Sequence, residues 1–198
     1  MKGVVFTQFV EMVEESFSLE VADHILTTCP LASGGVYTSV GTYDHSEMLM
    51  LVGSLSEHSG IPTSDLVKSF GRFLFQFFHR SFPSFFESAT SAKDFLNNVD
   101  SYIHVEVKKL YPDAQLPKFD IEEHGHGAFD MVYTSARPFA DLAHGLIDAA
   151  LEHFGETALL DRVDLSSPPG THAKFSILPT HHAEENRGSR ASASSGTA

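Results

Sequence analysis

The strongest pattern in this chain is a wide apolar face on one predicted helix. After Gly60-Ile61-Pro62, apolar residues recur at positions i, i+1, i+4, i+7, i+8, i+11 and i+12, as Leu66, Val67, Phe70, Phe73, Leu74, Phe77 and Phe78. This spacing is that of an amphipathic α-helix with one buried side. Residues 6–17 and 21–26 also have helical spacing. The first half of the chain is therefore predicted to be helical.

Polar residues mark where three of the other helices begin. Ser18 is suited to cap the helix over 21–26, because its hydroxyl can accept a backbone N–H that has no partner within the helix. Asp44, with Glu47 three residues later, predicts a capping box for a helix that carries the apolar residues of 48–55. Ser91 starts a further helix, and His104 lies on it near the apolar stripe.

Beyond Pro112 the apolar residues change from helical to alternating spacing. Two alternating segments, 119–121 and 129–133, flank a glycine-bearing turn, which predicts a β-hairpin. A second strand pair, 163–165 and 175–177, flanks another turn. Between the pairs, helical spacing begins near Pro138, which can occupy a first turn. The predicted fold class is α+β: a helical N-terminal half, then a C-terminal half with a small, about four-stranded antiparallel sheet and helices.

The chain has room for one domain. Its 198 residues suit a single sizeable core and leave too little for a comparable second domain. We expect that domain to span 1–180, with one helical subdomain at 1–62 and a second subdomain, containing the sheet, at 63–180. From His181 onward the only apolar residues are alanines. Residues 181–198 are therefore expected to form a disordered, low-complexity tail.

Charge and hydropathy argue against several classes of partner. The chain has 13 basic and 26 acidic side chains, with a formal net charge of −13, so it repels nucleic-acid phosphates and anionic lipid alike. No apolar run reaches the roughly 20 residues that span a bilayer, and Met1-Lys2-Gly3 leads into an amphipathic segment, not a signal peptide. We expect a cytoplasmic protein that binds neither nucleic acid nor membrane.

The reactive side chains do not suggest an enzyme. The single Cys29 excludes an internal disulfide, a multi-cysteine zinc site and the paired-cysteine attachment of a c-type haem. No nucleophile is paired with an evident base. The 17 Phe residues indicate a Phe-rich core, and such an interior also suits a large, flat, apolar ligand.

Two features could bind a charged or metal-containing ligand. Tyr133, Ser135 and Arg137 alternate at the end of a predicted strand, so their side chains can converge on one anion, such as a carboxylate. His104 could ligate a metal. Each feature has a plainer reading, because an isolated Tyr-x-Ser-x-Arg match is more often a strand end with a solvated arginine. A histidine beside an apolar helix stripe is more often a satisfied core or surface residue.

Three segments in order resemble one family. They are the helix that bears His104, the segment Tyr111-Pro112-Asp113-Ala114-Gln115-Leu116-Pro117-Lys118-Phe119, and Tyr133-Thr134-Ser135-Ala136-Arg137. With the spacing between His104 and Tyr133, they resemble the haem-nitric oxide/oxygen-binding (H-NOX) domains, relatives of the sensor domain of soluble guanylate cyclase. The resemblance covers nearly the whole chain, from Met1-Lys2-Gly3 to the strands before residue 180.

The resemblance implies a non-covalent haem b between the two halves of the fold. It implies that His104 is the proximal ligand of the iron, that Tyr133, Ser135 and Arg137 bind the propionates, and that Pro117 packs against and distorts the macrocycle. Residues 1–62 would then be the distal subdomain and 63–180 the proximal one. The distal pocket is assigned to Val5, Phe9, Phe78 and Leu142. The tryptophan that the family often has in its first two helices is missing, since the chain contains none.

The resemblance also implies which gas is sensed. Oxygen-binding members have a distal tyrosine where this chain has Leu142. Bound O₂ needs a hydrogen-bond donor, whereas NO binds ferrous haem tightly without one, so NO and CO binding is expected and stable O₂ binding is not. We expect a bacterial-type, stand-alone NO sensor that regulates a histidine kinase, or an enzyme that makes or degrades a cyclic di-nucleotide, in trans. The alternative is a haem-free ligand-binding or scaffold module with an apolar pocket, in which Arg137 anchors a carboxylate.

Overall fold

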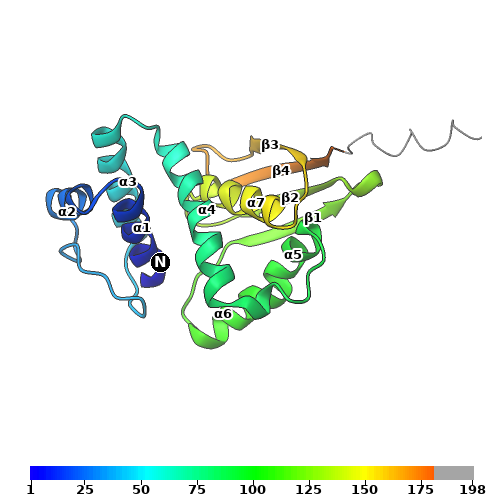
Figure 1. Cartoon of the computed structure of the whole chain (residues 1–198), viewed down its shortest axis with the longest axis horizontal. Helices are drawn as coiled ribbons and strands as arrows, with labels where there is room; N and C mark the ends of the chain where they lie inside the picture. Colours follow the sequence, from blue (N-terminus) through cyan, green and yellow to red (C-terminus); the bar gives the residue numbers. More distant parts are fainter. Residues whose placement is uncertain (181–198) are drawn as a thin grey trace, which may run out of the picture.

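The computed structural model describes residues 1–180, and the predicted tail at 181–198 lies outside the described residues. Three N-terminal helices lie on one side of the long helix α4, and the sheet with its helices lies on the other (Figure 1). The helices are α1 (Gly3–Ser16), α2 (Leu19–Thr28), α3 (His45–Ser59), α4 (Thr63–Ser81), α5 (Ala92–Asn98), α6 (His104–Leu110) and α7 (Ala140–His153).

The sheet has four antiparallel strands in the order β1-β2-β4-β3. They are β1 (Lys118–Glu123), β2 (Phe129–Thr134), β3 (Ala158–Asp164) and β4 (His172–Pro179). On the two central strands, alternate residues such as Met131 and Phe175 are buried, and α7 covers this inner face (Figure 1). The predicted α+β class is therefore confirmed. In one detail the prediction was wrong, because β3 begins at Ala158 and ends before Leu165.

Helix α4 connects two hydrophobic cores. Its first half, including Leu66 and Phe70, packs with α1 to α3, whereas Phe75 belongs to the cluster formed by α5, α7 and the sheet. The wide apolar face seen in the sequence is thus covered by different partners along its length. A subdomain boundary at 62/63 would assign α4 to the second part, although four of its six buried residues belong to the core of the first.

Helices α4 and α7 cross unusually closely, at a pair of glycines. A Cβ atom added to Gly145 would overlap the backbone carbonyl oxygen of Lys68, and it would lie 3.0 Å from the Cα of Gly71. A Cβ atom on Gly71 would overlap the carbonyl oxygen of Leu142. Only glycine fits at either position. The crossing sets where α7, and therefore Leu142, lies relative to α4.

The three predicted N-cap residues are confirmed, but the predicted role of Glu47 in a capping box is wrong. The hydroxyls of Ser18 and Ser91 accept backbone N–H groups of α2 and α5, and Asp44 caps α3 by accepting the Ser46 N–H at 2.8 Å. Glu47 does not complete the predicted capping box. Its buried carboxylate turns to the loop before α3 and accepts hydrogen bonds from Ser33 and, at 2.7 Å, from the Tyr37 hydroxyl.

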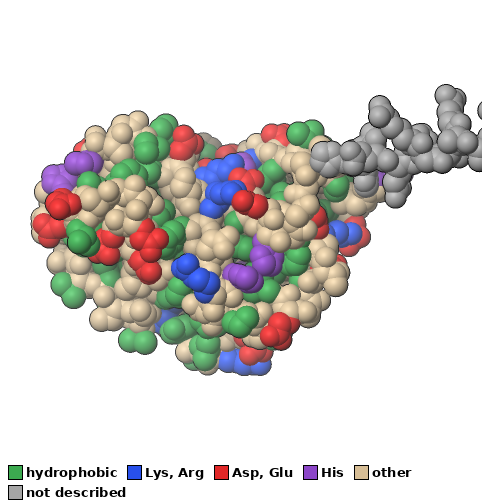
Figure 2. Space-filling model, in the orientation of Figure 1, with side chains coloured by type: hydrophobic (Ala, Val, Ile, Leu, Met, Phe, Trp, Pro, Cys, Tyr) green, Lys and Arg blue, Asp and Glu red, His purple; other side chains and the backbone are tan. Residues whose placement is uncertain are grey.

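Two further elements differ from the sequence reading. Pro138 lies just before α7, which begins at Ala140, so it is not in the first turn. The helix expected to continue through His104 is interrupted by a π-helical turn over Val99–Ile103, after which α6 begins at His104 itself. Within residues 1–180, no helix is both long and apolar enough to cross a membrane. Acidic side chains are widespread on the face shown in Figure 2, as the net charge leads one to expect.

Candidate functional site

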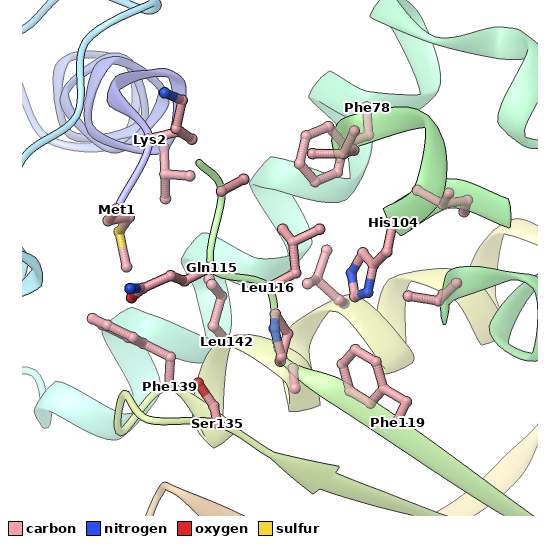
Figure 3. A pocket seen from close by; sticks show the side chains of 18 of the residues that line it. Met1, Lys2, Phe78, His104, Gln115, Leu116, Phe119, Ser135, Phe139 and Leu142 are labelled. Atoms are coloured by element: carbon pink, nitrogen blue, oxygen red, sulfur yellow. The ribbon is translucent and has the colours of Figure 1, made fainter. Parts of the chain in front are cut away.

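A largely apolar cavity lies between the N-terminal helices and the rest of the fold. The volume of the cavity that is accessible to the centre of a water molecule is about 300 Å³. Its walls come from the start of α1, from α4, from α6 and the segment after it, from the end of β2 and from α7 (Figure 3). Residues brought together from these elements include Val5, Phe78, His104, Pro117, Tyr133 and Leu142.

His104 presents its imidazole ring to this cavity (Figure 3). Its Nδ1 atom lies 2.6 Å from Oδ1 of Asp100, which precedes it by one π-helical turn. The other oxygen of Asp100 accepts the backbone N–H of Phe119 at 2.7 Å. One carboxylate therefore joins the histidine to strand β1. With the Nδ1 proton engaged by Asp100, the lone pair of the neutral ring is on Nε2, the atom left for a metal.

Burial keeps the His104 ring neutral. The side chain is 17% exposed, and burial lowers the pKa of His104 below 6.5, although the Asp100 carboxylate acts in the opposite direction. A neutral imidazole is the form that can coordinate iron. Sequence reasoning identified His104 but missed Asp100. The signal was available, because residues four apart in a helix lie on the same face.

Tyr133, Ser135 and Arg137 do lie close together, as predicted, but across the turn that follows β2 and not along a continuous strand. The buried Tyr133 hydroxyl donates to the backbone oxygen of Arg137 at 3.2 Å, and burial raises the pKa of Tyr133. The Ser135 hydroxyl accepts the backbone N–H of Arg137 at 3.1 Å. Strand β2 ends at Thr134, so these contacts fix the turn that carries the guanidinium. All three residues of the trio line the cavity.

The Arg137 guanidinium meets two oxygen acceptors. One nitrogen donates to the backbone oxygen of Gln115 at 3.1 Å, and the other donates to its side-chain oxygen at 2.9 Å. This two-pronged arrangement is the one that an arginine uses to bind a carboxylate. Gln115 was not singled out from the sequence. It lies in a segment without periodicity, and its contact with Arg137 joins residues far apart in the chain.

The residues assigned to the distal pocket fall into two groups. Val5, Phe78 and Leu142 line the cavity, as does Pro117 on the segment after α6. Phe9 does not line it. Only the start of α1 reaches the cavity, and Phe9 lies a turn further along, where it is fully buried with its ring centroid 5.2 Å from that of Phe70. The structure thus describes Phe9 as a core residue, and its part in the distal pocket stays a prediction.

The residues present fit a haem. A buried neutral imidazole faces an apolar space, and an arginine at its edge already holds two oxygen acceptors. A haem needs an axial nitrogen, apolar walls and a cation for its propionates. Among residues 1–180, no three His, Cys, Asp or Glu side chains gather to hold a bare metal ion.

Comparison with known proteins identifies the fold. The family model described as haem-NO-binding matches residues 2–161. The chain belongs to the haem-NO-binding (H-NOX) family. Members of this family bind haem and act as sensors of gases, so the coarse function expected from the sequence is confirmed. No curated protein sequence matches the chain significantly.

Solved H-NOX structures resemble the whole described part. The unliganded Fe(II) H-NOX protein from K. algicida is 37% identical, with a TM-score of 0.86 over 92% of this chain and 98% of that one. The Fe(II)CO form of the H-NOX from Shewanella woodyi is 41% identical, with a TM-score of 0.78 over 94% and 98%. The S. oneidensis H-NOX in its Fe(II)NO state is 25% identical, with a TM-score of 0.82 over 91% and 100%.

Proposed function

We propose that this H-NOX protein binds a non-covalent haem b through His104 and senses nitric oxide. The observation that carries the proposal is the neutral His104 ring, held at Nδ1 by Asp100 and turned toward the apolar cavity (Figure 3). Ferrous haem, when bound, supplies an iron with one coordination position left open to a diatomic gas. The comparison with an H-NOX solved in its Fe(II)NO state supports this choice of gas.

The remaining residues of the site have separate roles. Arg137 would pair with a propionate, because its fork already binds two oxygens, while Tyr133 and Ser135 hold the turn that aims it and complete the propionate site. Pro117 lies on the cavity wall, at the end of the segment that leads to β1, and would press on the macrocycle. Such a wall excludes water and fixes the orientation of the haem.

The cavity wall favours NO over O₂. Leu142 lines the cavity, and by the family resemblance it stands where oxygen-binding members have a tyrosine, whose hydroxyl would donate to bound O₂. NO and CO do not depend on such a donor. We therefore expect the ferrous protein to bind NO and CO and to form no stable complex with O₂ in air.

The signal would pass to a separate protein. We propose that the partner is a histidine kinase, or an enzyme that makes or degrades a cyclic di-nucleotide, and that this chain is itself no enzyme. The proposed partner class follows from the family resemblance. Affinity capture on the purified protein, with and without NO, should recover such a partner in a gas-dependent amount. Recovery that is independent of NO would contradict regulation by the gas.

Absorption spectroscopy tests the haem site directly. Protein expressed with ample haem should be coloured, with a sharp Soret band and a five-coordinate ferrous spectrum that changes on adding NO. His104→Ala should lose stable haem or recover it only with added imidazole, because the iron–nitrogen bond is gone. His58→Ala, at an exposed position of α3, is the matched control. Colourless wild-type protein would instead favour the haem-free module with Arg137 as its carboxylate anchor.

A further inference from the structure

The segment 111–117 crosses the edge of the cavity between α6 and β1. It contributes most of its residues to the cavity wall, among them Pro117. Polar contacts tie it to the rest of the protein at two points. Asp113 accepts hydrogen bonds from Lys2 at 3.1 Å and from Thr42 at 3.2 Å, both in the N-terminal part. Gln115 is held by Arg137 from the other side.

The contact between Gln115 and Arg137 imitates a bound carboxylate. Two nitrogens of the guanidinium each donate to one oxygen, at 3.1 Å and 2.9 Å, and both oxygens belong to Gln115. The side-chain oxygen is the second prong. Figure 3 shows the Gln115 side chain extending along the cavity edge toward Phe139. A ligand carboxylate that used both prongs of the fork would have to displace that side-chain oxygen.

We infer that Gln115 is a built-in competitor for the ligand's carboxylate on Arg137, and that the 111–117 segment is therefore a gate for loading the ligand. The inference rests on the proposed function, in which that ligand is haem. A neutral amide binds a guanidinium less strongly than a carboxylate does, so the ligand wins the exchange. While Gln115 occupies the fork, only part of the population can bind, and the apparent affinity falls by that fraction.

The contacts of Asp113 restrict the movement to the Gln115 end of the segment. Lys2 is only 14% exposed on its side chain, and besides Asp113 it contacts Thr42 and lies 5.0 Å from the centre of the Tyr111 ring. This contact does not involve the Arg137 fork. It holds the start of the segment against the N-terminal helices when Gln115 releases Arg137, so the segment can open at one end only.

Two substitutions of Gln115 should change haem affinity in opposite directions. Gln115→Ala removes the competing oxygen, and the apparent dissociation constant of haem should fall roughly three- to fivefold, the size expected for one exposed hydrogen bond. Gln115→Glu offers the fork a carboxylate, so haem should bind roughly tenfold more weakly at low salt, and this loss should shrink as salt rises. Both constants follow from rates of haem uptake by the haem-free full chain and of haem transfer to excess apomyoglobin.

Two controls separate competition from a merely loosened segment. In an Arg137→Ala background the two Gln115 variants should bind haem equally, because the fork for which they compete is gone. Asp113→Ala breaks the other tie and should not tighten haem binding. The inference is overturned if Gln115→Ala leaves affinity unchanged or weaker, if its gain survives in Arg137→Ala, or if Asp113→Ala reproduces it. Wild-type protein without a Soret band would overturn the proposed function itself, a result distinct from all three.

Discussion

Replacing Asp100 by asparagine keeps the size of the side chain and turns one acceptor oxygen into a donor. One oxygen of Asp100 now accepts from His104 at 2.6 Å and the other accepts the Phe119 N–H at 2.7 Å. The N–H of Phe119 can only donate, so the amide oxygen of asparagine should turn to it. The amide nitrogen would then donate to Nδ1 of His104, and the ring proton would move to Nε2. That is the wrong tautomer for binding iron.

The magnitude follows from the contact that is lost. A charge-assisted hydrogen bond is worth about 1.5–3 kcal/mol, and the Asp100 side chain is 32% exposed, so we take the lower end of that range. About 1.5 kcal/mol corresponds to roughly a tenfold change in affinity. Partners of this kind behind a metal-binding histidine are typically worth about 10–100-fold. Haem transfer from Asp100→Asn to excess apomyoglobin should therefore be roughly 10–100-fold faster than from wild type.

Asp100→Ala gives a different signature. It leaves the N–H of Phe119 without its acceptor, which should lower the free energy of unfolding by about 1–3 kcal/mol in urea titrations, but it leaves His104 free to choose its tautomer. Asparagine should thus be worse for haem retention and alanine worse for stability. Ser101→Ala, next to Asp100 and exposed, is the control. If Asp100→Asn retains haem as well as wild type does, the tautomer argument is wrong.

Three further outcomes are expected. Gly145→Ala should lower the free energy of unfolding by about 1–3 kcal/mol in urea, since its Cβ would overlap the Lys68 carbonyl; an unchanged value would mean that the helices separate freely. Burial and the Lys68 ammonium lower the pKa of His144 below 6.5 in the folded protein. As pH drops below 6.5, the unfolded chain therefore protonates His144 before the folded protein does, and the free energy of unfolding falls. His144→Gln should make this fall less steep in urea titrations. Leu142→Tyr adds a donor to the cavity and should give the ferrous protein an O₂-bound absorption spectrum in air that the wild type lacks; if no such spectrum forms, the hydroxyl does not reach the ligand.

Local periodicity explains why most of the fold could be predicted. The spacing of Leu66 to Phe78 and the alternation of Phe129 to Tyr133 depend only on neighbours in the chain, and both elements formed as expected. His104 and Arg137 were found because the family motif places them at characteristic positions. Gln115 could not be found in this way, because its role depends on a contact between a loop and a distant turn.

Glu47 shows how tertiary contacts override a local motif. Its position after Asp44 is what a capping box requires. In the fold its carboxylate is buried, and a buried carboxylate must be satisfied by hydrogen bonds. Ser33 and Tyr37 provide three donors, whereas the capping box would have offered the carboxylate one backbone N–H. Burial of the Tyr37 side chain itself raises the pKa of its hydroxyl, and the neighbouring Glu47 carboxylate acts in the same direction. The residues next to Glu47 in the sequence do not indicate that this loop folds back onto its carboxylate.

The shape of the cavity depends on the crossing of α4 and α7. Phe78 lines it from α4, beyond the crossing at Gly71, and Leu142 lines it from α7, before Gly145. Because the two backbones touch at the crossing, there is no side chain between them to absorb a change in their spacing. A larger distance between the two helices at the crossing would therefore displace both of these cavity walls at once. The sequence shows two glycines within helices, where glycine normally weakens a helix. Only the structure shows that each glycine is required by the close approach of the opposite helix's backbone.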